Sequence, residues 1–153
     1  MIPEFLENGY LPEGIYDASI EEVAERFVFS GKRRQLLNGL MELIAVCISS
    51  KINIIYLDGS FISKKLRPVD YDACYDTDHP DRLSILKDVN STALESDSEI
   101  QKQSFGGEIH YANANMAHIK GSPTILEWFQ TCKEDETLKK GIIRIILKRY
   151  DNE

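Results

Sequence analysis

The sequence predicts a single α/β (α+β) domain in which helices flank a mixed β-sheet. Amphipathic helical segments alternate along the chain with short runs rich in β-branched residues, which is the pattern of a mixed-class domain. The chain has 153 residues, 42% of them hydrophobic and 28% charged, as expected of one globular domain that can bury its own core. No internal repeat or low-complexity tract divides it, so residues 1–153 are interpreted as one unit.

The chain is predicted to open with an extended arm and a short helix. Residues 1–18 are rich in Pro and Gly, which punctuate regular structure, and we expect them to form an extended N-terminal arm. Ser19 and Glu22 have the spacing of a capping box, in which each side chain accepts a hydrogen bond from the backbone of the other residue. This pair predicts a helix from Ser19 to about Phe27.

A longer helix and two strands are predicted next. The helix covers residues 32–49, because apolar residues recur there at steps of three and four and should face the core: Leu36, Leu37, Leu40, Leu43, Ile44 and Cys47. Residues 52–57, INIIYL, are too few for an independent helix and predict a buried strand. Residues 69–75 alternate in polarity and predict a second strand.

The second half of the chain is predicted to contain two further helical segments and two further strands. Helical spacing indicates a helix over residues 81–89 and one or two helical turns over residues 124–130. Residues 105–111 and 141–147 are candidate strands. We expect three side chains of the 124–130 segment to pack in the core: Leu126, Trp128 and Phe129.

Net charge and cysteine content restrict the class of protein. A net charge of −7 argues against a strong nucleic-acid-binding surface, which needs Lys and Arg to neutralise phosphates. Cys47, Cys74 and Cys132 are widely spaced and form no C-x-x-C pair, so they predict free thiols in a reducing compartment. No leader-like segment or long apolar run is present, so we expect no membrane association and a cytoplasmic protein.

The most informative stretch is residues 54–76, IIYLDGSFISKKLRPVDYDACYD. Gly59 allows a sharp turn and a close approach of the backbone to a ligand, and Ser60 offers a hydroxyl and an amide to a phosphate oxygen. Asp70 and Asp72 are two residues apart on the second predicted strand, so both carboxylates should leave the same face, about 6.5 to 7 Å apart. Two such acids suit two Mg²⁺ ions that share a triphosphate.

Each half of this motif also has a plain structural interpretation. Gly59 and Ser60 are common in ordinary turns from a strand to a loop, and Asp70 and Asp72 could form a solvated strand edge. Against the second interpretation, the acids share their face with Cys74 and Asp76, while apolar residues occupy the opposite face. Cys74 is interpreted as a small buried residue and not as a nucleophile.

The motif resembles the hallmark of the nucleotidyltransferase superfamily related to DNA polymerase beta. That hallmark is Gly-Ser, a loop of about ten residues, and Asp-x-Asp or Asp-x-Glu; here Gly59-Ser60 is followed by nine residues and then by Asp70-Tyr71-Asp72. The minimal nucleotidyltransferases of bacteria are about this size. The resemblance implies a mixed sheet with the Gly-Ser turn and the paired acids on neighbouring strands. It also implies transfer of a nucleotidyl group from a nucleoside triphosphate (NTP) with Mg²⁺.

The chain also resembles, over most of its length, an uncharacterised bacterial family whose members open with MIPEF-x-x-NGYLP-x-GI. In that family KRR is followed by LL-x-GL, and YLDGSF recurs; this chain has the same segments at residues 32–34, 36–40 and 56–61. This second resemblance supports the fold and implies no activity.

A catalytic nucleotidyltransferase normally carries a third carboxylate on an adjacent strand, and Glu108 in FGGEIHY is the best candidate in this chain. The alternative is that Glu108 is an exposed strand residue. Lys64, Lys65 and Arg67 follow the Gly-Ser turn, and they either reach triphosphate oxygens or belong to a solvated loop.

Two further groups of basic residues carry weaker signals. Residues 32–34, KRR, begin the longer helix, where cations oppose the helix dipole, so they either serve a ligand or partner or belong to a frayed first turn. His79, His110 and His118 form no cluster in the sequence that would suggest zinc or a catalytic triad.

Two functional classes follow from the sequence. In the first, the protein is an enzyme that uses Mg²⁺ and an NTP to move a nucleotidyl group onto a hydroxyl of a protein, an RNA or a small molecule. In the minimal nucleotidyltransferases that the chain resembles, the acceptor is often a partner toxin and the small protein acts as its antitoxin. In the second, catalysis is lost and the fold acts by binding a partner. A clear third carboxylate beside Asp70 and Asp72 favours the enzyme.

Overall fold

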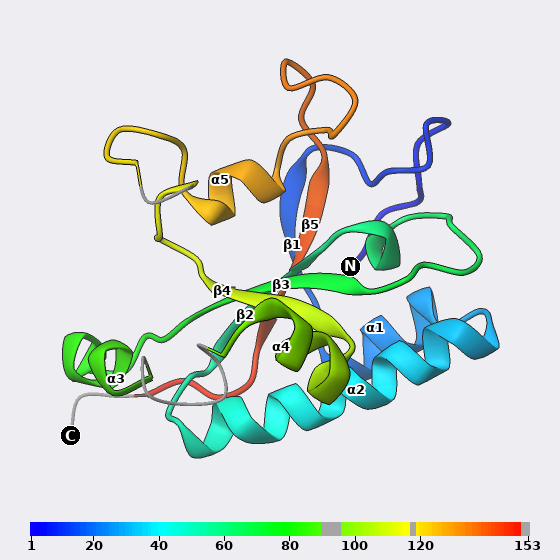
Figure 1. Cartoon of the computed structure of the whole chain (residues 1–153). Helices are drawn as coiled ribbons and strands as arrows, with labels where there is room; N and C mark the ends of the chain where they lie inside the picture. The colour runs from blue at the N-terminus through cyan, green and yellow to red at the C-terminus, as the bar shows by residue number, and fades with distance from the viewer. Residues whose placement is uncertain (90–95, 117–118, 151–153) are drawn as a thin grey trace.

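The computed structural model describes residues 1–89, 96–116 and 119–150, which fold around one five-stranded mixed sheet (Figure 1). The strands lie in the order β1-β5-β2-β3-β4. Strand β1 is parallel to β5 and β3 is parallel to β4, while β2 is antiparallel to both β3 and β5. The strand bounds are β1 Gly14–Asp17, β2 Ile54–Asp58, β3 Tyr71–Asp76, β4 Gly107–Tyr111 and β5 Gly141–Ile146. The predicted class, a mixed sheet flanked by helices, is confirmed.

The long helix α2 runs along one face of the sheet, and the short helix α5 lies on the opposite side (Figure 1). The helices are α1 Ile20–Phe27, α2 Gly31–Ser49, α3 Arg82–Val89, α4 Ser98–Phe105 and α5 Ile125–Phe129, and a short 3-10 helix, η1, covers Ser60–Ile62. Within the described ranges, no helix combines the length and the apolar character that crossing a bilayer requires.

Helices α1 and α2 form for the reasons that the sequence predicts. The Ser19 hydroxyl accepts from the Glu22 amide and the Glu22 carboxylate accepts from the Ser19 amide, which completes the capping box. Helix α2 begins one residue earlier than predicted, at Gly31, because the Ser30 hydroxyl caps it by accepting from the Arg33 amide. All six apolar residues predicted to face the core from α2 are buried.

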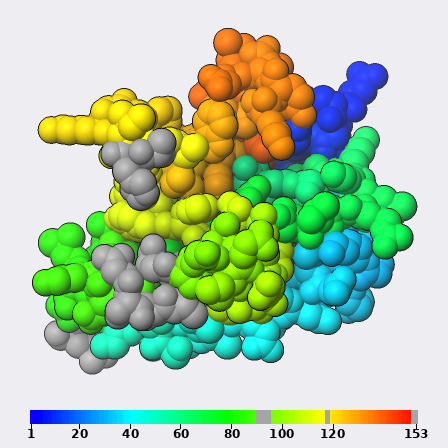
Figure 2. All heavy atoms as spheres, viewed as in Figure 1, coloured from blue at the N-terminus to red at the C-terminus, as the bar shows by residue number. Residues whose placement is uncertain are grey.

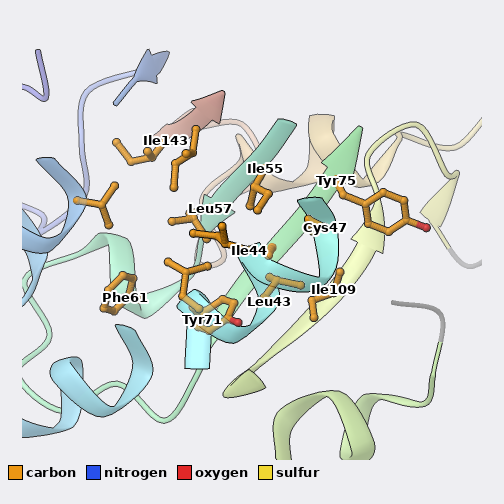
Figure 3. Packing of buried hydrophobic residues seen from close by; sticks show 14 of the residues in the cluster. Leu43, Ile44, Cys47, Ile55, Leu57, Phe61, Tyr71, Tyr75, Ile109 and Ile143 are labelled. Carbon is orange, nitrogen blue, oxygen red and sulfur yellow. The ribbon is translucent and has the colours of Figure 1, made fainter. Parts of the chain in front are cut away.

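The sheet separates an apolar face from a mixed face. On the apolar face, side chains from four strands pack against α1 and α2 in the main core, as Figure 3 shows for Leu57, Tyr71, Ile109 and Ile143. On the other face, α5 covers only a small cluster of Tyr56, Cys74, Ala112, Phe129 and Ile142. The uncovered part of that second face is available for polar side chains.

Tertiary contacts change four of the local predictions. The N-terminal arm is not wholly extended loop, because residues 14–17 add strand β1 beside β5. Residues 98–105 form helix α4, so Phe105 ends a helix and does not begin a strand. Strand β3 begins at Tyr71, which leaves Asp70 in the preceding loop. Trp128 is not a core residue, since 37% of it is exposed.

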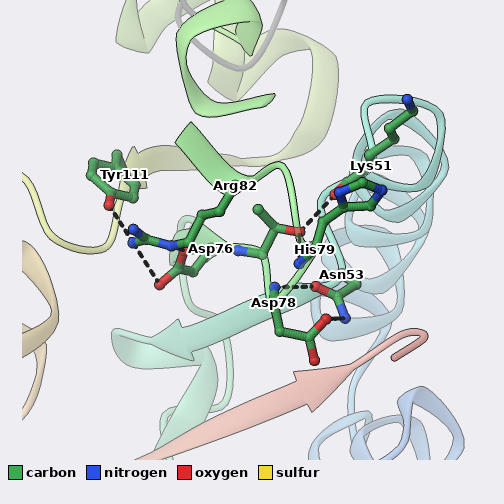
Figure 4. A network of polar contacts seen from close by, with 8 residues as sticks. Lys51, Asn53, Asp76, Asp78, His79, Arg82 and Tyr111 are labelled. Atoms are coloured by element: carbon green, nitrogen blue, oxygen red, sulfur yellow. Dashed lines mark hydrogen bonds and ion pairs between the residues drawn. The ribbon is translucent and has the colours of Figure 1, made fainter. Parts of the chain in front are cut away.

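A polar network fixes the far ends of the central strands (Figure 4). Arg82 of α3 donates to Asp76 at the end of β3 and to the Tyr111 hydroxyl at the end of β4. Asn53 and Asp78 hydrogen bond to each other through the Asn53 side-chain amide and the Asp78 backbone and carboxylate. Asp76 is therefore engaged with Arg82 at the end of β3 opposite to Asp70.

Candidate functional site

A cavity of about 530 Å³ opens where β2 ends and β3 begins. Three segments distant in the sequence line it: the N-terminal arm, the 58–72 stretch and the 128–140 segment, which begins at the end of α5. In Figure 2 the segment around residues 130–140 (orange) projects above the loop that follows β2 (turquoise to green) and beside the N-terminal segment (blue). The lining residues are Tyr10, Asp58, Gly59, Ser60, Ser63, Lys65, Asp70, Asp72, Trp128, Thr131, Lys133, Glu134 and Lys140.

The structure brings together both halves of the sequence motif, since Gly59, Ser60, Asp70 and Asp72 all line this cavity. Gly59 has a φ of +85°, a conformation that L side chains rarely adopt. A Cβ at this position would lie 2.6 Å from Oδ2 of Asp72, closer than packing allows. Glycine is therefore required here both for the turn and for the approach of the backbone to the Asp72 carboxylate.

Three carboxylates form a row across three neighbouring strands. Asp58 at the end of β2 is the register partner of Asp72 in β3, and Asp72 is the register partner of Glu108 in β4. Register partners on adjacent strands point to the same face, with the strands about 4.8 Å apart. Glu108 therefore lies beside Asp72 on the mixed face of the sheet, although it is not among the residues that line the cavity.

Burial and mutual repulsion perturb the acids of this row. The pKa of Asp72 is raised, first by burial and then by the negative charges of Asp70 and Glu108, while Lys140 and His110 act in the opposite direction. Burial raises the pKa of Asp58 to about 6, even though Nζ of Lys140 lies 3.0 Å from its Oδ1. The clustered carboxylates therefore favour any cation that enters between them.

Lys102 and His110 lie against two of these carboxylates. Nζ of Lys102 lies 3.5 Å from Oδ2 of Asp70 and 3.3 Å from Oε1 of Glu108, and Nε2 of His110 lies 3.5 Å from Oε2 of Glu108. Among the described residues, no group of three or more His, Cys, Asp and Glu side chains is arranged to hold a metal ion.

The chemistry of the donor set nevertheless fits Mg²⁺. Asp70, Asp72 and Glu108 offer only carboxylate oxygens, the ligands that this ion prefers. The pKa of Asp72 is raised by burial first and then by the negative charges of Asp70 and Glu108. A metal ion at these acids would require the exposed ammonium group of Lys102 to move away.

The basic residues predicted to contact a triphosphate divide into two groups. Lys65 lines the cavity, whereas Lys64 and Arg67 are exposed and do not line it. Arg67 instead borders a shallow depression beside the start of α2. Two lysines that the sequence analysis did not select, Lys133 and Lys140, line the cavity together with Lys65.

Arg33 supports the site from within the core, and does not serve a ligand or partner as one interpretation of the KRR segment predicted. Its side chain is fully buried. The hydrogen bonds described for its guanidinium all go to backbone carbonyl oxygens, those of Phe27, Ser60, Phe61, Ser63 and Lys65. Four of these carbonyls belong to the loop after Gly59, so Arg33 holds that loop in place.

The sequence analysis missed several residues of the cavity. Asp58 directly precedes the Gly-Ser pair, and a polar residue at the end of an apolar strand was a local signal for it. Tyr10, Trp128, Glu134 and Lys140 lie far from the motif in sequence, and no local pattern connects them with it. The histidines do not gather at the cavity: His79 packs on Tyr150, His110 contacts Glu108, and His118 lies outside the described residues.

Comparison with known proteins identifies a family but no activity. The model of a family described as "Family of unknown function (DUF6932)" matches residues 3–146. Neither the curated proteins nor the solved structures provide a match to the chain. The matched residues include the whole lining of the cavity.

Proposed function

The chain belongs to this family of unknown function, and from the site itself we propose that it is a Mg²⁺-dependent nucleotidyltransferase. The single observation that carries the proposal is the row of Asp58, Asp72 and Glu108 in strand register beside the Gly59-Ser60 turn. A bare surface turn or a solvated strand edge would not need a glycine that abuts a partly buried carboxylate. Nor would it place three aspartates, a Gly-Ser turn and three lysines around one cavity.

The residues of the cavity have complementary tasks in this reaction. The Gly59-Ser60 turn and the ammonium groups of Lys65 and Lys133 receive the negatively charged phosphates. Asp70 and Asp72 are the carboxylates that would hold Mg²⁺, with Glu108 as the third ligand. The bound metal would supply Lewis-acid stabilisation of negative charge on the reacting phosphate and on the leaving pyrophosphate.

The transfer step has a defined balance of bonds and protons. The oxygen of an acceptor hydroxyl forms a bond to the α-phosphorus of the NTP, and the bond from that phosphorus to the bridging oxygen of the pyrophosphate breaks. The hydroxyl proton passes to Glu108, which stands beside Asp72 at the edge of the site. The acceptor belongs to a protein such as a partner toxin, to an RNA or to a small molecule.

Thermal stability in the presence of Mg²⁺ and ATP or GTP tests the binding half of the proposal. A ligand that binds only the folded state raises the free energy of unfolding by mass action, so the wild type should melt at a higher temperature with both components. Asp70→Asn and Asp72→Asn should lose most of this gain. Asp81→Asn, an exposed site outside the cavity, is the matched control and should keep it. Equal gains in all four proteins would show that Asp70 and Asp72 hold no metal.

Label transfer tests the catalytic half. With labelled NTP, Mg²⁺ and the protein encoded by a neighbouring gene, the wild type should label the partner. Glu108→Gln should abolish labelling but keep most of the Mg²⁺-NTP thermal gain, because the carboxylate is needed chiefly to orient or deprotonate the acceptor hydroxyl. Labelling by Glu108→Gln at the wild-type rate would contradict the role given to Glu108.

One specific observation favours a second candidate function, a degenerate domain that binds a partner without catalysis. Lys102 already neutralises Asp70 and Glu108, and Lys140 already neutralises Asp58, so these acids have counter-charges without metal. Binding of Mg²⁺-NTP by the wild type with no labelling of its partner would favour this second function.

A further inference from the structure

Trp128 is a large aromatic side chain exposed inside the cavity. It lines the cavity while 37% of its surface remains exposed, although the helix that carries it is firmly anchored. Thr124 and Glu127 complete a capping box at the start of α5, and Phe129 is buried under its end. The position of Trp128 is therefore fixed by its neighbours, and its side chain belongs to neither hydrophobic cluster, so its exposed part can contact a ligand.

Tyr10 presents a second ring to the same cavity from the N-terminal arm. Its hydroxyl donates to both carboxylate oxygens of Glu134, at 2.8 and 2.9 Å, and Nζ of Lys140 lies 5.2 Å from the ring centroid. Burial, followed by the hydrogen bond and the charge of Glu134, raises the pKa of Tyr10 to about 12. The ring is thus neutral and oriented by contacts at its hydroxyl end.

We propose that Trp128 and Tyr10 form the subsite for the base of the nucleotide, an inference that rests on the proposed function. The lysines that would receive the phosphates and the aspartates that would hold the metal account for most of the charged lining of the cavity. The two rings account for its uncharged aromatic lining. A nucleobase is a planar, neutral heteroaromatic ring that stacks on such side chains. Thr131 and Glu134 also line the cavity and offer polar groups to the edge of the base.

The size of the cavity agrees with this assignment. Cavities that bind molecules as large as a nucleotide occupy about 300 to 1,000 Å³, and this one measures about 530 Å³. Stacking of a base on an aromatic side chain changes affinity by about 5-fold to about 150-fold when the ring is removed. The contribution of Trp128 is therefore large enough to measure in a single variant.

The test compares ATP with inorganic tripolyphosphate, which carries the phosphates but no base. Both are titrated by calorimetry, with Mg²⁺, into the full-length wild type, Trp128→Leu and the matched variant Trp128→Phe. We expect Trp128→Leu to weaken ATP by at least about 5-fold and leave tripolyphosphate unchanged, and Trp128→Phe to retain most of the ATP affinity because the ring is kept. Trp128 is the only tryptophan, so ATP should also quench wild-type tryptophan fluorescence more than tripolyphosphate does.

The outcomes distinguish failure of this inference from failure of the proposed function. If ATP and tripolyphosphate bind the wild type but Trp128→Leu weakens neither, the base lies elsewhere and the subsite is wrong while the nucleotide site stands. If Trp128→Leu weakens both ligands equally, its ring supports the cavity and does not contact the base, which also overturns the inference. If neither ligand binds the wild type, the proposed function fails, and the subsite fails with it.

Discussion

Replacement of Arg33 by methionine should destabilise the protein severely. The change removes a buried guanidinium but keeps much of its aliphatic volume, so the principal loss is hydrogen bonding. Arg33 donates to five backbone carbonyl oxygens, and the loop after Gly59 receives most of these bonds. The pKa of Arg33, lowered by burial to about 10, leaves the group charged at neutral pH.

The size of the effect follows from these contacts. An acceptor left buried without a donor costs about 1 to 3 kcal/mol, but some of these carbonyls have other donors or can reach water, as Ser60 also accepts from the Ser63 hydroxyl. The loss of the buried charge removes its own desolvation penalty, so we take a net cost of about 4 kcal/mol. For a domain of this length, that cost lowers Tm by roughly 8 to 16 °C.

Calorimetric melting of Arg33→Met and Arg34→Met at pH 7 measures this effect with matched controls. Both variants lose one positive charge from adjacent positions in the first turn of α2, but Arg34 is exposed, so its replacement should change the free energy of unfolding by less than about 0.5 kcal/mol. If Arg33→Met melted within about 3 °C of Arg34→Met, the carbonyl contacts of Arg33 would not stabilise the fold, and the reasoning would be refuted.

Three further predictions address the cavity. Gly59→Ala should lose the thermal gain from Mg²⁺-ATP because its Cβ displaces the Asp72 carboxylate. Gly121→Ala should keep the gain, because Gly121 has a similar φ of +87° but an added Cβ there would meet no atom within 4 Å. Equal losses in the two variants would implicate backbone strain instead. The carboxyl of Asp58 keeps its proton in the folded state up to about pH 6 but only to about pH 3.8 when unfolded, so its contribution to stability should fall as pH rises between these values. The Tm of the wild type minus that of Asp58→Asn should therefore decrease from pH 4 to pH 6, and an increase would contradict the assigned direction of the pKa shift. Lys102→Met should tighten Mg²⁺ binding a few-fold, since its ammonium contacts Asp70 and Glu108 where the metal would bind; unchanged affinity in a metal titration would place the metal elsewhere.

Local sequence determines the elements whose stabilising contacts lie within a few residues. The capping box of Ser19 and Glu22 starts α1, and the spacing of apolar residues in α2 fixes which of its faces meets the core. Alternation in β3 places Tyr71 in the main core and Cys74 in the smaller cluster on the opposite face. These features can be predicted from the sequence because helix caps and side-chain periodicity depend on neighbours in the chain.

Elements that depend on distant partners cannot be predicted from the local sequence. The four residues of β1 carry no continuous apolar run and become a strand by pairing with β5, more than a hundred residues later. Helix α4 is mostly polar, and it is held by packing against α2 and by the Gln101 side chain, which exchanges two hydrogen bonds with the backbone of Ile109. Tertiary contacts outweigh weak local propensity in both cases.

Some residues of the candidate site could likewise be predicted from the local sequence, and others only from the fold. Gly59, Ser60, Asp70 and Asp72 were found from the sequence because one turn and one strand start bring them together over a short stretch of chain. The register of β3 with β4 puts Glu108 beside Asp72. Only the folded chain brings Tyr10 from its N-terminal arm, and Trp128, Lys133 and Lys140 from its C-terminal part, to the same cavity. In the sequence, Arg33 is one of three consecutive basic residues, and only the fold shows that it is buried among carbonyl oxygens. A spacing motif reports chemistry within one segment, whereas the cavity is formed by segments whose proximity is set by packing of the whole sheet.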